Sequence, residues 1–457
     1  MPHAGEGETG ATGGPPGGSA ATRPLGTTAQ GQWGDWLPPA EAWRRVLAAW
    51  GPPSPLPAQE VGLAAAYRRV LATDVRAPAD SPLFDRSAVD GYAVRAADAA
   101  IASPQIPARL AYAGEVAMGA GSTVTVGPGQ AVWVATGAML PAGADGVIMV
   151  ERTARDAETV LLRQSVSGGD NVVRRGSDLR AGGLVLRAGH TVRPQDVAVL
   201  ASMGLAAVAV RPRPRVAIIA GGDELVSPGQ PLGPGQIYDA NSYAMAAQIE
   251  SWGGAPHILP RVPDQPDAVR AALRQAVSEA HLVLLSGGSS VGIKDLSAEA
   301  IDAVGRPGVV VHGVAMRPGR PTMVGVVNGV LVVGIPGNPV SAMVACEVFA
   351  RPAVETLLGV VPARVAGVTG DGVATGRLSA RVPSQQGRQD YVRVRLIQDG
   401  DVHDRDAQET GSVGMIVEPV PGGSGVIRSM VDADGLLIVP PDRADLESGE
   451  SVEVRLF

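Results

Sequence analysis

Lysine is almost absent from this 457-residue sequence: of its 38 basic residues only Lys294 is a lysine, and the others are arginines. A Walker A phosphate-binding loop requires a lysine of its own, and Gly292-Ile293-Lys294-Asp295 does not match that loop. Lysine-dependent kinase sites and pyridoxal Schiff-base sites are equally hard to place. The scarcity of lysine therefore argues against several common classes of nucleotide and cofactor enzymes.

Cysteine is also scarce, and the sequence has neither clustered histidines nor long apolar runs. Cys346 is the single cysteine, so it can form neither an internal disulfide nor a thiolate cluster, and we expect a reducing, cytoplasmic location. The six histidines are scattered, which disfavours a zinc enzyme. The net charge of −7 argues against a nucleic-acid partner. No apolar run reaches the roughly 18 residues of a membrane span, and the start lacks the pattern of a signal peptide.

Glycine and proline are abundant instead, with 60 and 38 residues, and they predict a loop-rich protein. Residues 1–32 combine many of these residues with few large apolar side chains, which predicts a disordered tail. At roughly 100–200 residues per domain, the remaining chain has room for several domains.

Changes of pattern predict how these domains are arranged. Short strands broken by glycine and proline extend to residue 210, and Arg211-Pro212-Arg213-Pro214 is a natural boundary. Strands then alternate with helices, which is typical of an α/β domain with a largely parallel sheet. The end of the chain returns to short strands. We assign a small β domain to 76–150, an extended first region to 33–75 and 151–210, the α/β domain to 211–360 and a C-terminal β domain to 361–457.

Hydrophobic spacing predicts individual elements. A helix is expected over 39–50, a second short helix at about 60–71, and Asn241 is expected to cap a helix over 242–252. Further helices are expected at 194–204 and 267–280, and buried strands at 216–220, 282–285 and 331–335.

Glycine-rich turns follow three of the expected strands, at 221–224, 286–292 and 336–339. The carboxyl ends of parallel strands meet at one edge of a sheet, where ligands bind in open α/β folds. Glycine allows close approach of the backbone to an anion, and following helix N-termini offer free N–H groups. Glycine that merely permits tight turns is the alternative, but three converging turns favour an anion pocket.

Charged side chains accompany the same edge. Asp223, Glu224 and Asp295 suit a Mg²⁺ ion that bridges carboxylates to a phosphate, although a single loop acid is more often simply solvated. Arg317 and Arg320 carry forked donors that suit a phosphate or another oxyanion, although surface charge on a turn is the alternative.

Two loops in the first half are also rich in polar residues. The segment 81–94 contains Asp85, Ser87 and Asp90, and the loop 136–145 begins at Thr136 and ends at Asp145. Taken alone, these side chains are most simply explained as turn residues that bond their own backbone.

Together, these segments resemble the molybdopterin molybdenumtransferase family, represented by MoeA and the E domain of gephyrin. The resemblance runs in order from about residue 36 to 457. It is carried by the segments 84–93, 136–145, 169–178, 222–225, 235–242, 286–292, 317–321, 334–341, 425–430 and 434–440.

The resemblance implies a fold and an activity. Members of the family are elongated homodimers of four-domain subunits, with a three-layer molybdopterin-binding α/β domain, small β domains, one of them barrel-like, and a mixed, extended first region. They insert molybdate into adenylylated molybdopterin and release AMP, with help from Mg²⁺, in the last step of molybdenum cofactor synthesis. The enzyme that adenylylates molybdopterin upstream is a candidate partner.

The resemblance also implies a cleft shared between two subunits, and roles for particular residues. It assigns catalysis to Asp90, Thr136, Asp178 and Asp264, and metal binding to Asp223, Glu224 and Asp295. It assigns substrate binding to Gly222, Ser286, Gly287, Gly288, Ser290, Arg317, Arg320, Pro336, Gly337, Asn338 and Ser341.

The sequence departs from the family pattern at a few positions. Gly221 stands where Ser or Thr is usual, Ser289 replaces a valine, Ile293 replaces an acid, and Arg317 and Arg320 replace lysines. The loss of the acid at 293 removes one possible metal ligand. Two other functions remain open at this stage, namely adenylyl transfer to molybdopterin and a scaffold role without turnover.

Overall fold

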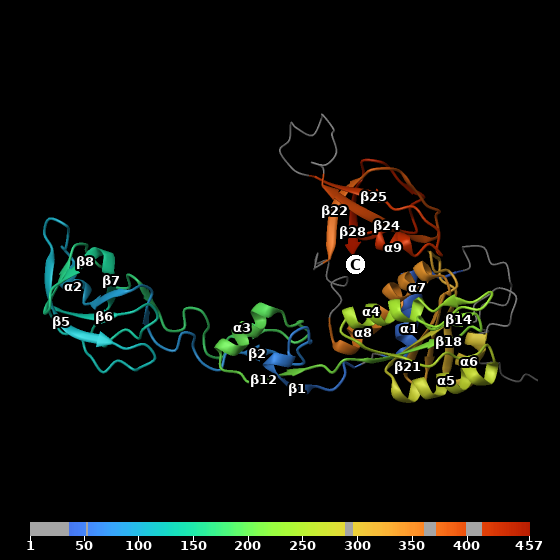
Figure 1. Ribbon diagram of the computed structural model, residues 1–457, viewed down its shortest axis with the longest axis horizontal. Coiled ribbons are helices and arrows are strands. Elements are labelled where there is room, and N and C mark those ends of the chain that lie inside the picture. Colours follow the sequence, from blue (N-terminus) through green and yellow to red (C-terminus); the bar gives the residue numbers. More distant parts are fainter. Residues whose placement is uncertain (1–35, 52–53, 288–295, 361–371, 399–413) are drawn as a thin grey trace, which may run out of the picture.

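The computed structural model describes residues 36–51, 54–287, 296–360, 372–398 and 414–457. A narrow arm links a small β domain at one end of the molecule to the α/β domain at the other end (Figure 1). The C-terminal β domain sits on the α/β domain. The predicted fold class, α/β with additional β domains, is confirmed.

The α/β domain is built on a six-stranded sheet in the order β16-β13-β17-β21-β20-β18. The first four strands run parallel, and β20 and β18 are antiparallel to their neighbours. The strands are β13 (Arg215–Ala220), β16 (Ala255–Ile258), β17 (Leu282–Ser286), β18 (Pro307–His312), β20 (Met323–Val327) and β21 (Val330–Ile335). Strands β13, β17 and β21 confirm the three predicted buried strands.

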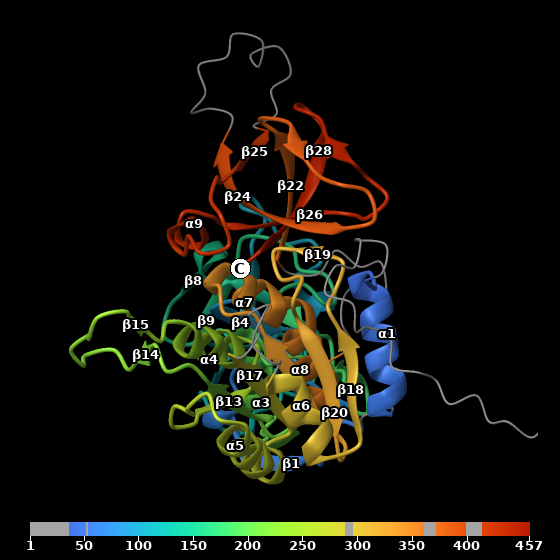
Figure 2. The ribbon, with the colours of Figure 1, turned by 90° about the vertical axis from the view of Figure 1, so that its right-hand side faces the viewer.

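Helices cover both faces of this sheet, so the domain has three layers (Figure 2). One face packs against α1 (Pro39–Trp50), α4 (Asn241–Ser251), α7 (Pro339–Ala345), the π-helical η4 (Cys346–Ala350) and α8 (Arg351–Leu358). The other face packs against α5 (Pro266–Glu279) and α6 (Leu296–Val304). Helix α1 has the predicted bounds, but it belongs to this core rather than to the extended region, because Ala42 and Val46 are fully buried here. Trp50 Nε1 also donates to Gly329 O (2.9 Å).

The arm consists of three short antiparallel pairs that join the outgoing chain to the returning chain. They are β1 (Gln59–Gly62) with β12 (Ala207–Val210), β2 (Val75–Arg76) with β11 (Leu184–Leu186), and β3 (Arg86–Ser87) with β10 (Val172–Val173). The 3₁₀ turn η2 (Leu63–Ala65) and helix α3 (Pro194–Ser202) enclose a small core. The prediction of a helix at 60–71 was wrong, because pairing with the distant β12 overrides the local apolar spacing.

The small β domain has one six-stranded sheet in the order β7-β4-β6-β5-β9-β8. Its strands are β4 (Gly91–Val94), β5 (Ala108–Val116), β6 (Gln130–Val134), β7 (Gly146–Met149), β8 (Thr153–Arg155) and β9 (Thr159–Leu162), with helix α2 (Ala96–Ala99) and the 3₁₀ turn η3 (Val150–Arg152). The sheet continues beyond the predicted boundary at residue 150, because β9 pairs along β5 and buries Val160 and Leu162.

The C-terminal domain is a closed barrel, since β24 pairs with both β25 and β26. Its strands are β22 (Val373–Leu378), β24 (Gln389–Gln398), β25 (Met415–Pro419), β26 (Gly435–Val439) and β28 (Ser451–Leu456), accompanied by β23 (Val382–Pro383), β27 (Asp445–Leu446) and helix α9 (Arg428–Val431). Strand β19 (Met316–Arg317) comes from the α/β domain and pairs with β24, which joins the two domains. In the described part of the chain, no helix is long and apolar enough to cross a membrane.

Candidate active site

The sheet of the α/β domain has a topological switch point between β13 and β17. The chain leaves β13 for β16 on one side and then returns to place β17 on the other side. Ligands of open α/β sheets bind in the crevice outside the carboxyl ends of such neighbouring strands. Gly221 and Gly222 follow β13 directly, and Gly287 follows β17. The glycine turns predicted from the sequence therefore lie where this fold binds ligands.

Backbone geometry explains the glycine at two of these positions. Gly287 has φ +118°, and an added Cβ would lie 2.3 Å from Gly221 O, which is too close for any side chain. Gly222 has φ +142°, and its Cβ would meet the carboxylate of Glu224. Gly221 N donates to Ser286 O (2.7 Å), so the two turns are joined directly. Side chains at Gly222 and Gly287 would close this part of the crevice.

Three carboxylates border the glycine turns. Asp223, Glu224 and Asp264 are all exposed. Asp264 Oδ1 lies 3.8 Å from the position of a Cβ on Gly221, so a side chain there would face this carboxylate without a clash. Asp223 lies 3.9 Å from Arg261. Within the described residues, no group of three or more acidic, histidine or cysteine side chains forms a metal site.

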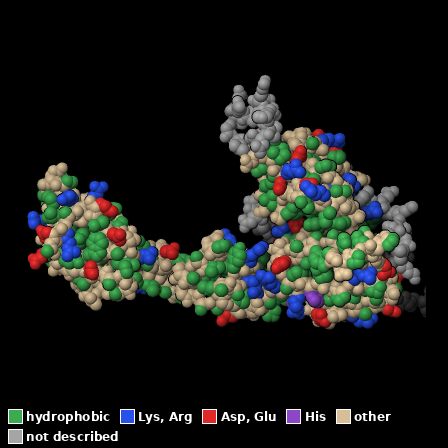
Figure 3. All heavy atoms as spheres, in the orientation of Figure 1, with side chains coloured by type: hydrophobic (Ala, Val, Ile, Leu, Met, Phe, Trp, Pro, Cys, Tyr) green, Lys and Arg blue, Asp and Glu red, His purple; other side chains and the backbone are tan. Residues whose placement is uncertain are grey.

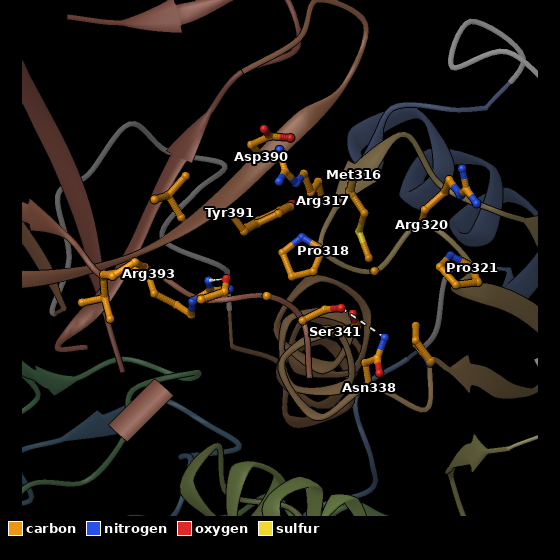
Figure 4. A pocket seen from close by; sticks show the side chains of 18 of the residues that line it. Met316, Arg317, Pro318, Arg320, Pro321, Asn338, Ser341, Asp390, Tyr391 and Arg393 are labelled. Carbon is orange, nitrogen blue, oxygen red and sulfur yellow. Dashed lines mark hydrogen bonds between the residues drawn. The ribbon is translucent and has the colours of Figure 1, made fainter. Parts of the chain in front are cut away.

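A cleft of about 1020 Å³ opens between the α/β domain and the C-terminal barrel (Figure 4). It contains Glu224 and most of the predicted substrate-binding residues that the structure describes, namely Gly287, Arg317, Arg320, Pro336, Gly337, Asn338 and Ser341. Ser286 is buried at the end of β17 behind Gly287. Gly222, Asp223 and Asp264 border the same edge outside the lining of the cleft. Gly288, Ser290 and Asp295 lie outside the described residues.

Arginines from both domains converge on this cleft (Figure 4). Pairing of β19 with β24 sets Arg317 beside Asp390 in register. Arg393 is buried, and its guanidinium donates to Gly422 O, while its Nε has no hydrogen-bond partner in the described structure. Burial, and then the nearby charge of Arg317, lower the pKa of Arg393. Two positive groups held together in this way favour an anion between them.

The loop between β21 and α7 is held in place from two sides. Asn241 Nδ2 donates to Gly337 O (2.8 Å), and Asn338 Nδ2 donates to Ser424 Oγ (3.1 Å). The predicted cap of α4 was therefore wrong. Asp239 Oδ1 accepts from Ser242 N (3.0 Å), while Asn241 is used to position the site.

The predicted catalytic pair Asp90 and Thr136 meets in the small β domain. Thr136 donates to Asp90 Oδ1 through both its N–H (2.6 Å) and its hydroxyl group (2.9 Å). These two hydrogen bonds hold the pKa of Asp90 below its usual range. The carboxylate is therefore ionised at neutral pH and can accept a hydrogen bond.

Within one chain, Asp90 and Thr136 lie far from the cleft, because the arm separates their domain from the α/β domain (Figure 1). Asp178 is exposed in a turn beyond β10, where its N–H donates to Ser81 O (3.0 Å). Asp85 has a structural role, but not within its own turn, because it accepts from Arg175 N (2.8 Å) and Arg174 Nη1 (2.7 Å) of the returning chain. The predicted residues thus form two separate groups in the chain.

Sequence reasoning missed the contribution of the C-terminal barrel to the cleft. Arg388 and Asp390 form a buried bidentate ion pair, with distances of 2.6 and 2.7 Å, and Asp390 and Tyr391 line the cleft. Residues 419–424 line the opposite wall. The alternating charges in Arg388-Gln389-Asp390 were a signal, but only the pairing of β24 with β19 brings them to the site.

Comparisons with known proteins agree with this architecture. Residues 37–204 match the MoeA N-terminal region (domain I and II), residues 217–356 match the probable molybdopterin binding domain, and residues 375–457 match the MoeA C-terminal region (domain IV). A molybdopterin molybdenumtransferase 2 from Mycobacterium tuberculosis is 37% identical over 86% of this chain and 94% of its own length. The chain belongs to the molybdopterin molybdenumtransferase family.

Other relatives extend this result. A molybdopterin molybdenumtransferase from Bacillus subtilis is 34% identical over 87% of this chain and 89% of its own length. A crystal structure of a molybdopterin biosynthesis MoeA protein from Pyrococcus horikoshii has a TM-score of 0.75 at 33% identity, over 92% of this chain and 99% of that one. Another crystal structure of a molybdopterin biosynthesis MoeA protein from Pyrococcus horikoshii has a TM-score of 0.76 at 29% identity, over 92% of this chain and 100% of that one. The family resemblance drawn from the sequence is confirmed.

Proposed function

We propose that this member of the family is a molybdopterin molybdenumtransferase that inserts molybdate into adenylylated molybdopterin and releases AMP. The observation that carries the proposal is the cleft at the topological switch point, which combines close-approach glycines with arginines from two domains. Both substrates are anions, and forked guanidinium donors suit phosphate and tetrahedral oxyanions. The transferases named among the relatives support the same activity.

Different residues of the chain would bind the substrates and assist the chemistry. The N–H group of Gly287 and the hydroxyl group of Ser341 would bind phosphate oxygens, and Arg317 and Arg320 would bind further anionic groups. Asp90, ionised and held by Thr136, would accept a proton or orient a reacting oxygen. This placement separates substrate binding from the group that assists the chemistry.

Mg²⁺ is the cofactor that we propose. It commonly binds through one or two carboxylates together with substrate phosphates, and the exposed carboxylates of Glu224 and Asp223 beside the glycine turns fit that donor set. Bound there, it would neutralise charge on the pyrophosphate of the substrate. Asp295 is the third ligand expected from the sequence, and Arg261 near Asp223 would have to accommodate the ion.

We further propose that the working enzyme is a homodimer in the cytoplasm. A single chain holds the Asp90–Thr136 pair at one end and the cleft at the other (Figure 1), so a second copy would complete each site. Asp178 would face Asp264 across the same shared cleft. The upstream adenylyltransferase is a partner that could pass on its adenylylated product.

The deciding experiment uses the purified full chain with adenylylated molybdopterin, molybdate and Mg²⁺. We expect AMP and finished cofactor to appear in equal amounts, and Arg317→Gln to weaken substrate binding. A parallel reaction with molybdopterin and ATP tests adenylyl transfer, for which we expect no product. Binding of the adenylylated substrate without AMP release would instead indicate a scaffold and would contradict the proposed activity.

A further inference from the structure

A second cavity, of about 290 Å³, lies where the arm joins the α/β domain. We call it the junction pocket. Its walls come from the turn after η2, from Arg213 in the crossover before β13, from the end of α4 and from α8. Figure 3 shows basic side chains gathered on the surface where the arm meets this domain. The junction pocket shares no lining residue with the large cleft.

Positive charge exceeds negative charge in this pocket, since four arginines and two glutamates line it. Arg351 is neutralised, because it contacts Glu347 (2.7 Å) and Glu355 (2.8 Å). The remaining acid, Glu250, is exposed at the end of α4. The unbalanced charge therefore belongs to Arg68, Arg69 and Arg213.

These three arginines have few partners in the protein. Arg69 Nη2 donates to Arg211 O (2.9 Å), and burial followed by the charge of Arg213 lowers the pKa of Arg69. Among the described residues, neither Arg68 nor Arg213 has a side-chain hydrogen bond or an ion pair. Like charges that converge on a concave site and outnumber its one remaining acid, Glu250, are stabilised by a bound anion.

The backbone at Arg68 adopts a conformation that is unfavourable for an arginine. Its φ is +59°, a left-handed conformation that favours glycine, and its N–H is held by Val192 O (2.8 Å). An arginine at this position is not required by the turn, because glycine would fit with less strain. Its side chain therefore needs a separate explanation, and binding supplies one.

We propose that the junction pocket binds a phosphate-class oxyanion. Forked guanidinium groups from Arg68, Arg69 and Arg213 would hold its oxygens, and the hydroxyl group of Thr191 would add a donor. The cavity is large enough for the anion with a small substituent but not for a helix. Since the arginines come from the arm and from the crossover, the bound anion would also fix the arm against the α/β domain.

The test is isothermal calorimetry on the full chain in a phosphate-free, low-salt buffer, titrated with inorganic phosphate and separately with AMP. Arg68→Gly is the informative variant, because glycine suits φ +59° and keeps the turn folded. We expect its dissociation constant for phosphate, and that of Arg213→Gln, to rise about tenfold. The matched control is Arg187→Gln, which removes an exposed arginine of the arm and should change binding by less than about twofold.

Two further comparisons complete the test. Arg317→Gln alters the large cleft, so phosphate binding that persists in it and falls in Arg68→Gly supports the junction pocket. AMP could bind more tightly than phosphate and lose this binding in Arg68→Gly and Arg213→Gln. That result would identify a nucleotide, rather than the free ion, as the ligand that supplies the phosphate group. The proposal is overturned if phosphate fails to bind, if binding is lost only in Arg317→Gln, or if Arg68→Gly and Arg187→Gln behave alike.

Discussion

Asp90 shows how a single residue can look like a turn former and yet be suited to chemistry. Its neighbour Gly91 begins β4, and Thr136 reaches it from the end of β6 with two donors to the same oxygen. An Asp that served only its own turn would bond to residues close in sequence. The long-range contact instead fixes an ionised carboxylate on an exposed surface.

We predict that Asp90→Asn keeps the fold and binds adenylylated molybdopterin within a few-fold of the wild type. Molybdate insertion should fall by roughly 10²–10⁴-fold, the usual effect of losing a positioned acid or base. Both quantities are measured on one preparation. Asp156→Asn is the control, since Asp156 accepts only from nearby backbone N–H groups of the same domain, and near wild-type insertion by Asp90→Asn would make Asp90 a turn residue.

The pH dependence of Asp90 tests the same contact. The pKa of Asp90 is lowered in the folded chain, so the ionised carboxylate stabilises the fold. This contribution to the free energy of unfolding is complete above the usual unfolded pKa of about 3.9, and it is lost as the pH falls through the folded pKa. Thr136→Val removes the hydroxyl donor but keeps the N–H. We expect the pKa of Asp90, followed by NMR, to rise part of the way towards its usual value, so that protonation begins at a higher pH.

Gly287 is a second residue whose identity follows from geometry. Gly287→Ala would combine φ +118° with a Cβ that lies 2.3 Å from Gly221 O. We predict a loss of about 1–3 kcal/mol in the free energy of unfolding, measured with denaturant, together with weaker substrate binding. Gly121→Ala, where φ is negative and no atom lies within 4 Å, should stay within about 0.5 kcal/mol of the wild type. Equal stability of the two variants would contradict this account.

At the scale of elements, the π-helical turn η4 connects the two domains that form the cleft. Its Glu347 is buried and contacts Arg351 of α8 (2.7 Å) and Arg455 of β28 (3.4 Å). A carboxylate shared in this way joins the α/β domain to the C-terminal barrel. The short pairing of β19 with β24 and the hydrogen bond from Asn338 to Ser424 are further connections.

We predict that Glu347→Gln lowers the free energy of unfolding by about 1–3 kcal/mol, because it leaves Arg455 without its acidic partner near the domain boundary. Glu355→Gln is the matched control, since Glu355 contacts Arg351 within one helix and should cost less. Calorimetric unfolding measures both variants. A larger loss for Glu355→Gln would show that the contact between domains contributes little.

At the scale of the whole molecule, the arm is what keeps the two groups of site residues apart in one chain. The proposed homodimer predicts that two defective subunits can complement each other. Asp90→Asn and Arg317→Gln homodimers should each be nearly inactive. After they are mixed and allowed to exchange subunits, half of the dimers would carry one intact site, so activity should recover to about a quarter of the wild-type value. Failure to recover after verified exchange would indicate that each chain acts alone.

The N-terminal segment gives a further prediction at this scale. Residues 1–32 lie outside the described residues, and their composition predicts too little apolar surface to offset the entropy of ordering. Deletion of these residues should therefore leave the melting temperature and the turnover rate nearly unchanged. A large loss of either in the truncated chain would show that the segment has a structural or catalytic role.

The sequence by itself determined the family, the α/β character of the central domain and most of the residues that this domain contributes to the cleft. Hydrophobic spacing was sufficient for α1, α5 and the buried strands because these elements bury a regular apolar face. The glycine turns could also be predicted from the sequence, since a positive φ or a close approach of neighbouring atoms restricts the residue type at the position itself. Each of these signals is local.

Tertiary structure decided what local signals do not contain. The segment predicted as a helix at 60–71 instead begins within β1 and continues into the 3₁₀ turn η2. Its pairing partner, β12, lies about 150 residues away in the chain, so local spacing could not reveal the pairing. Helix α1 joined the α/β core, β8 and β9 joined the small β domain, and Asn241 bonded Gly337 rather than its own helix. Asp390 and Arg393 reached the cleft only through barrel closure and the β19–β24 pairing. Contacts between distant segments depend on the free energy of the whole packed molecule, which no short stretch of sequence specifies.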